Sequence, residues 1–171
     1  SPLRAMADGG IHDHLGGGFH RYSVDDQWRI PHFEKMLYDQ AQLAVAYLEA
    51  YQLSKEEAWK TTATDILEYV LTSLTNESGG FSASEDAESA VEAGAPEKKE
   101  EGIFYLWTKG EVEQALGVPA AKLFLSRFGI EEDGNAVHDP SGLLRGKNVL
   151  YSAQSLEDSA RVAGLGQPGR R

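Results

Sequence analysis

Cysteine is missing from all 171 residues, so this segment has no disulfide, no thiolate metal site and no cysteine nucleophile. Basic residues are scarce: 16 Lys and Arg stand against 27 Asp and Glu, which gives a net charge of −11. Nucleic acids and anionic membrane surfaces bind basic faces, so neither is an expected partner. The acidic balance fits neutral or cationic small ligands better.

Long hydrophobic runs are also missing. No stretch approaches the roughly 20 apolar residues that a membrane span needs, and no secretory signal opens the chain. We therefore expect a soluble protein, and the sequence assigns it no compartment. Hydrophobic residues still make up 41% of the sequence, which is enough for a globular core.

Apolar residues recur at helical spacing in several segments. Pro31 is expected to open a helix over about 32–52, whose second half is apolar nearly all round and therefore buried. Ser54 and Glu57 have the spacing of a capping box that opens a second helix, which runs to about Leu74. The two helices predict an antiparallel hairpin. Thr108 and Glu111 repeat the capping-box spacing and open a shorter helix over 108–117. Further short helices are expected over 119–129 and 153–163.

Three other segments lack a helical pattern. Residues 9–31 are rich in glycine, histidine and aromatic residues, which predicts a long structured loop of the kind that often carries function. The acidic segment 88–101 is expected to be a mobile loop within a domain over 1–151. Residues 152–171 are expected to hold a C-terminal helix and a disordered tail.

Polar residues gather at the start of the first long helix. On a helix, His32, Lys35 and Asp39 share one face, and Glu34 and Tyr38 share another. Polar groups at the mouth of a buried helix need partners or water, which the floor of a pocket would supply. The alternative is a surface pair of Lys35 with Asp39 and a tyrosine hydroxyl bonded to a loop.

A second group of acids follows a glycine-led turn. Glu85 and Asp86 there can face Glu34 or Asp39 across a cleft. Glycosidic bonds are cleaved by two carboxylates about 5 Å or about 6.5–9.5 Å apart. The alternative is that these loop acids are solvated and have no such role.

Histidines and aromatic rings lie beside these polar groups. His12 and His14 alternate, with His20 and His32 nearby, and such rings can bind zinc or a sugar. No defined ligand spacing appears, so we predict no metal site and no cofactor, and histidines bonded to loop backbone are the alternative. Aromatic rings can stack on sugar faces or simply anchor loops. The rings concerned are Phe19, Tyr22, Trp28, Tyr38, Phe81, Tyr105 and Trp107.

Several strings of residues resemble the spermatogenesis-associated protein 20 family, and the match covers about residues 3–151. The contiguous string Pro-His-Phe-Glu-Lys-Met-Leu-Tyr-Asp-Gln at 31–40 is highly specific. The other strings that carry the resemblance are Gly9–His14, Gly18–Ser23, Gly79–Phe81, Glu85–Ala87, Glu101–Gly102, Tyr105–Thr108 and Gly146–Leu150.

The resemblance implies a particular architecture. Family members begin with a thioredoxin-like domain that bears cysteines and continue into a six-hairpin, glycosidase-like (α/α) toroid, similar to sugar epimerases and glycoside hydrolases. This chain resembles part of the toroid only, so an all-α fold with short β segments in its loops is expected. Part of a toroid leaves helix faces open, so the chain should be poorly stable alone or should self-associate.

Two functions remain open. The first is carbohydrate processing by a hydrolase or epimerase, or sugar binding, with a role in sperm development that the family name suggests. The second is a non-catalytic scaffold or binding module whose activity lies in the thioredoxin-like domain that this chain lacks. The acid–base candidates are Asp39, Glu34 and Asp86. The candidates for binding a carbohydrate or other neutral small molecule are His14, His20, Arg21, Trp28, His32, Tyr38 and Gln40.

Overall fold

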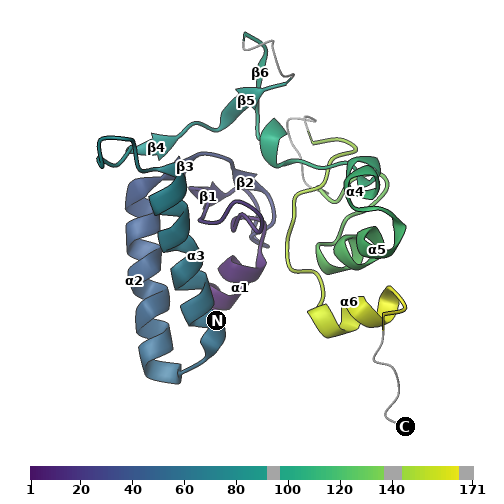
Figure 1. The fold of residues 1–171 in the computed structure, drawn as a ribbon, viewed down its shortest axis with the longest axis horizontal. Helices are drawn as coiled ribbons and strands as arrows, with labels where there is room; N and C mark the ends of the chain where they lie inside the picture. Colours follow the sequence, from purple (N-terminus) through teal and green to yellow (C-terminus); the bar gives the residue numbers. More distant parts are fainter. Residues whose placement is uncertain (92–96, 137–143, 166–171) are drawn as a thin grey trace.

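A computed structural model describes residues 1–91, 97–136 and 144–165. These residues form a mostly helical molecule with short strands and without a closed sheet, as the sequence predicts. The toroid itself stays a prediction. Figure 1 shows the pair α2 and α3 on one side, the shorter helices α4 to α6 on the other, and the glycine-rich segment with α1 between them. In the described part of the chain, no helix is both long and apolar enough to cross a membrane.

The helices follow the sequence pattern closely in most places. Their bounds are α1 (Pro2–Asp8), α2 (Leu37–Ser54), α3 (Glu57–Ser73), α4 (Lys109–Leu116), α5 (Val118–Arg127) and α6 (Leu156–Val162), with one 3-10 turn at η1 (Ile103–Tyr105). The strands pair antiparallel in twos: β1 (Tyr22–Ser23) with β2 (Pro31–His32), β3 (Lys35–Met36) with β4 (Ser84–Glu85), and β5 (Glu88–Ala90) with β6 (Lys99–Glu101).

The start of α2 is the largest departure from the sequence expectation. A helix from residue 32 was wrong, because Pro31–His32 form β2, Lys35–Met36 form β3, and α2 begins only at Leu37. In β3, Lys35 pairs with Glu85 and Met36 with Ser84. Strand partners at residues 22–23 and 84–85 therefore decide the conformation of this segment, and its local helical pattern does not.

The two predicted capping boxes have different outcomes. The Ser54–Glu57 box was wrong, because Ser54 belongs to the end of α2 and its hydroxyl donates back to a carbonyl of that helix. Lys55 then turns the chain in a left-handed conformation with φ of 61°. The Thr108–Glu111 box is confirmed: Glu111 N donates to Thr108 Oγ1 at 3.2 Å, and Thr108 N donates to the Glu111 carboxylate at 2.6 Å.

The segments expected to be mobile are described only in part. β5 and β6 pair the two ends of 88–101, whereas residues 92–96 lie outside the described residues. The helix expected over 153–163 is present as α6, and residues 166–171 of the tail lie outside the described residues. The proposed division into 1–151 and 152–171 stays a prediction.

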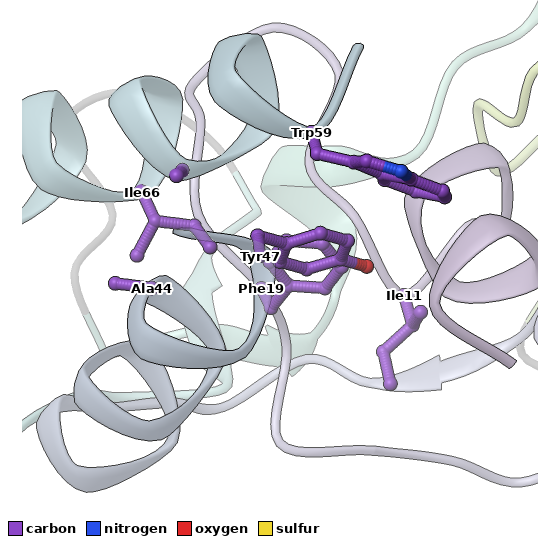
Figure 2. Packing of buried hydrophobic residues seen from close by; sticks show 7 residues of the cluster. Ile11, Phe19, Ala44, Tyr47, Trp59 and Ile66 are labelled. Atoms are coloured by element: carbon purple, nitrogen blue, oxygen red, sulfur yellow. The ribbon is translucent and has the colours of Figure 1, made fainter. Parts of the chain in front are cut away.

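The main apolar core lies between the α2–α3 pair and the glycine-rich segment. Figure 2 shows the rings of Phe19, Tyr47 and Trp59 close together within it, with ring centroids 5.6 Å apart for the first pair and 5.9 Å for the second. The Tyr47 hydroxyl donates to Leu3 O at 2.8 Å. The core therefore fixes the glycine-rich segment against the helices. Its buried members are Ile11, Phe19, Ala44, Tyr47, Trp59, Ala63 and Ile66.

The outer face of α2 has no cover in the described structure. Tyr38, Ala41, Val45 and Leu48 follow one another at steps of three and four residues, which is the spacing of a helix–helix seam. Val45 is 55% exposed and Leu48 47%. The expectation that the second half of α2 is buried nearly all round was therefore wrong.

We expect the isolated chain to self-associate through this outer face of α2, because apolar surface exposed along a helix is buried by association. Sedimentation at rising protein concentration should show an increasing average mass. Changing both Val45→Gln and Leu48→Gln should return the chain toward a monomer. The matched control Leu116→Gln, at a 44% exposed leucine of α4, should leave association unchanged. A strict monomer that melts cooperatively at every concentration would contradict the expectation.

Candidate functional site

The predicted site residues divide into two places in the structure. One is a charged cluster at the surface, where β1, β2 and the start of α2 meet. The other is a partly open cavity of about 550 Å³ between the glycine-rich segment and residues 103–107. A buried Lys35–Asp13 ion pair lies beside the cavity.

The surface cluster is built on the pairing of β1 with β2. Arg21 Nη1 donates to Glu34 Oε2 at 2.9 Å, and His32 Nε2 lies 3.6 Å from the same oxygen. His32 Nδ1 lies 2.6 Å from Glu101 Oε1. The ring of Tyr22, opposite His32 in the ladder, stacks on it with centroids 5.0 Å apart. Two acids, an imidazole and a guanidinium thus meet at a partly exposed surface.

Asp39 stands in the first turn of α2 next to this cluster. Its Oδ2 is buried and has no hydrogen-bond partner among the described residues. Burial raises the pKa of Asp39 above its ordinary value; the Arg21 guanidinium opposes this shift and Glu34 adds to it. The hydrogen bond that Arg21 donates to Glu34, together with the nearby Tyr38, raises the pKa of Arg21. The structure thus connects five of the predicted site residues: Arg21, His32, Glu34, Tyr38 and Asp39.

Lys35 points away from this cluster into the protein. Its side chain is 1% exposed, and Nζ lies 2.7 Å from Asp13 Oδ2 and 2.9 Å from Gly17 O. The ammonium also faces the rings of Tyr69 at 4.3 Å and Tyr105 at 5.0 Å. The alternative of a surface Lys35–Asp39 pair was therefore wrong. Because Lys35 lies in a strand, its side chain takes the inward side of the alternation.

Glu85, one residue before the predicted Asp86, is the inward-facing acid of β4. Its two oxygens accept hydrogen bonds from Tyr69 and Tyr105, each at 2.7 Å. Burial and then Glu85 raise the pKa of both phenols. Asp86 is exposed and accepts only from Glu88 N, at 3.2 Å, among the described residues. No hydrogen bond or ion pair joins Asp86 to the surface cluster in this part of the chain.

His14 and His20 line the cavity together with aromatic rings, and no residue of the surface cluster lines it. His14 Nε2 donates to Gly9 O at 2.9 Å, and His20 Nδ1 donates to Phe33 O at 3.1 Å. Burial is the main cause that lowers the pKa of His14 to about 4 and that of His20 to about 3. Both rings are neutral at neutral pH, so the second nitrogen of each is an acceptor.

His12 also reaches the cavity wall, but the protein uses both of its ring nitrogens. Nδ1 lies 3.0 Å from Ala7 O, and Nε2 lies 2.9 Å from Asp65 Oδ2. The same Asp65 oxygen accepts from Gly18 N at 3.0 Å. His12 thus fits the alternative of a histidine held by its own surroundings. Asp65 escaped sequence reasoning because its partners, His12 and the Gly18 amide, lie about 50 residues away in the sequence.

Gln40 and Trp28 hold the glycine-rich segment in place. Gln40 is buried; its amide accepts from Phe19 N at 2.8 Å and donates to Phe19 O at 2.6 Å. Trp28 has a φ of 62° and packs against the main core. Neither residue lines the cavity. In the described ranges, no group of three or more His, Asp or Glu side chains is arranged to hold a metal ion.

Comparison with known proteins gives clear relatives, although no family model matches the chain. The chain is 49% identical over 174 residues to spermatogenesis-associated protein 20 of Homo sapiens and 48% identical to that of Mus musculus. Each match covers 95% of this chain and 22% of the relative. An uncharacterised protein of Caenorhabditis elegans is 44% identical over 92% of this chain and 23% of its own length. The chain thus spans about 22% of the length of its mammalian relatives.

Proposed function

We propose, for a chain whose resemblance to the spermatogenesis-associated protein 20 family is confirmed, that the surface cluster at the start of α2 is an acid–base site for carbohydrate chemistry. The site would belong to a larger (α/α) toroid, of which this chain supplies a part. The names of the mammalian relatives connect them with sperm development, and we propose the same setting for this chain.

The observation that carries the proposal is that two neighbouring carboxylates have unequal surroundings. Glu34 is ion-paired with Arg21 at 2.9 Å. Asp39 has a buried oxygen without a partner among the described residues and a raised pKa. Glycosidic chemistry needs one carboxyl that keeps its proton and one that stays ionised, and its raised pKa suits Asp39 to the first of these roles.

Aromatic and polar groups around these acids support a sugar as the ligand. Tyr22 and Tyr38 are about half exposed, and the Tyr22 ring already stacks on His32. Exposed rings offer a flat surface to the C–H face of a sugar. Arg21 and His32 supply hydrogen-bond donors toward hydroxyl oxygens.

The test is Asp39→Asn in the full-length protein, assayed for turnover on a panel of glycans. Loss of a general acid should slow turnover by roughly 10²- to 10⁴-fold. The melting temperature should stay the same or rise slightly, because the change removes a carboxylate that lacks a partner. The control Asp26→Asn, at an exposed acid of the loop between β1 and β2, should leave turnover unchanged. An unchanged rate in Asp39→Asn would remove Asp39 from the mechanism.

The second candidate function is a non-catalytic binding module or scaffold. It is favoured because the polar groups of the cluster already bind one another: Arg21 pairs with Glu34, and His32 contacts Glu34 and Glu101. On this view, the activity of the whole protein lies in a thioredoxin-like domain outside this chain. Glycan binding without turnover of any panel member, in wild type and Asp39→Asn alike, would favour this function over the first.

A further inference from the structure

We propose that the cavity beside residues 103–107 is a second binding site, distinct from the surface cluster, for a neutral alcohol with an apolar, aromatic body. Arg21, His32, Glu34 and Asp39 contribute nothing to its lining. The inference therefore goes beyond the acid–base proposal and stands or falls without it. It follows from three features of the cavity. The wall is apolar, two histidine nitrogens can accept hydrogen bonds, and the carboxylates of the wall already have partners.

The cavity has the size and the wall of a site for a small organic molecule. Its volume of about 550 Å³ lies within the roughly 300–1,000 Å³ of ligand pockets. Phe33, Phe104 and Trp107 contribute aromatic rings to the lining, and Leu15 contributes an aliphatic side chain. Phe104 is 70% exposed and Leu15 55%. These two therefore offer uncovered apolar surface to a ligand that enters the cavity.

Two neutral imidazoles give this apolar cavity a specific polar requirement. His14 and His20 each donate one ring N–H to a backbone carbonyl, so the other nitrogen of each ring is a lone-pair acceptor. Neither acceptor nitrogen has a hydrogen-bond partner within the described ranges. His20 is 3% exposed and packs edge-on against Tyr105 with centroids 4.7 Å apart. An acceptor held in this way selects a ligand that carries a hydroxyl donor.

The charges around the cavity favour a neutral ligand. The lining contains no Lys or Arg, so an anion would find no counter-charge on the wall. Its two acids are already occupied. Asp13 accepts from Lys35 Nζ and from the backbone of residues 15 and 16, while Glu111 accepts from Thr108 in the capping box. A cation would therefore have to compete with existing partners of these carboxylates.

The experiment titrates the whole chain with three matched probes by calorimetry. The first is 3-phenoxy-1,2-propanediol, which has one aromatic ring and two hydroxyl donors. The second is butyl phenyl ether, which lacks the donors, and the third is phenoxyacetate, which is an anion. We expect saturable binding of the diol with a dissociation constant on the order of millimolar, as suits a ligand of this size. The ether and the anion should bind at least roughly fivefold more weakly.

The location is tested by Phe104→Ala, which trims an exposed ring and should not prevent folding. It should weaken diol binding by roughly fivefold to tenfold. The matched control Phe81→Ala, at an exposed ring outside the cavity lining, should not change it. His20→Phe keeps a flat ring and should make the diol and the ether bind alike.

Each result bears on the proposal. Absence of saturable diol binding overturns the site. Equal binding of diol and ether to the wild type overturns the role of the histidine acceptors. Tighter binding of the anion overturns the charge argument, and full affinity in Phe104→Ala moves binding out of this cavity.

Discussion

Replacing Lys35 with methionine is expected to lower the free energy of unfolding by about 3–5 kcal/mol, the cost of breaking a buried ion pair on one side. Lys35 is 1% exposed, and its ammonium lies 2.7 Å from the Asp13 carboxylate. Methionine fills the space of the lysine stem but leaves Asp13 buried with an uncompensated charge. The two hydrogen bonds to backbone N–H that Asp13 accepts replace only part of the lost stabilisation.

Urea unfolding of a small set of variants measures this effect. Adding Asp13→Asn to Lys35→Met should recover a large part of the lost free energy, because asparagine is uncharged and can still accept from the loop backbone. Lys60→Met removes an exposed lysine that pairs with Glu57 and should cost at most about 1 kcal/mol. A double variant less stable than Lys35→Met alone would show that the charge of Asp13 is not the cause.

The pH dependence of stability gives an independent check on the same pair. Burial raises the pKa of Asp13, but Lys35 and the loop N–H groups outweigh it, so the folded-state pKa is lowered. The stabilisation is therefore present above the unfolded pKa of about 4 and is lost as pH falls through the folded value. In Lys35→Met, the lysine no longer opposes the effect of burial on the pKa of Asp13. Protonation of Asp13 should then remove the uncompensated buried charge. The stability gap between variant and wild type should then narrow as the pH is lowered.

Gly18→Ala is expected to cost about 2–4 kcal/mol, the sum of a backbone penalty and overpacking. Gly18 has a φ of 72°, and an added Cβ would lie 2.5 Å from Tyr69 Cδ1 and 3.0 Å from Gln40 Oε1. Tyr69 is held by Glu85 and Gln40 by Phe19, so neither can move without losing a hydrogen bond. The substitution therefore strains the contact between the glycine-rich segment and the α2–α3 pair.

Gly79→Ala separates the two causes. Gly79 has a φ of 83°, but an added Cβ would meet nothing within 4 Å. Thermal or urea unfolding should show a loss of only about 1–2 kcal/mol for Gly79→Ala. If both alanine variants lose the same stability, the close packing around Gly18 contributes nothing and the backbone penalty explains the whole effect.

Local patterns in the sequence predicted the helices well and the strands poorly. The α2–α3 pair follows from apolar periodicity, and the Thr108–Glu111 capping box is a signal of four residues. The extended segment 31–36 is different, because its partners are residues 22–23 and 84–85. A strand of two residues is too short to show an alternating pattern, so the sequence around Pro31 does not predict β2 or β3.

The same distinction explains which site residues could be foreseen. Arg21, His32, Glu34 and Asp39 lie close together in the sequence and do meet in the structure. The Lys35 environment could not be foreseen, since it draws Tyr69 from α3 and Tyr105 from the 3-10 turn. The two tyrosines meet at Glu85, which the β3–β4 pairing places opposite Lys35 and which accepts a hydrogen bond from each. Their separate sequence neighbourhoods look like ordinary core.

The pairing of β3 with β4 makes a closed ring of the chain between residues 35 and 85. The ladder joins the residue before α2 to the segment after α3, and Leu37 N donates to Ala83 O at 2.9 Å beside it. The helical pair is therefore joined at both ends, by the turn at Lys55 and by the β3–β4 pairing. Neither helix can move away from the other without breaking one of these connections. Cleavage of the backbone at Lys55 would leave two fragments, one with α2 and one with α3, that the β3–β4 pairing still holds together. The surface cluster lies at the end that the β3–β4 pairing joins, so its side chains would keep their arrangement.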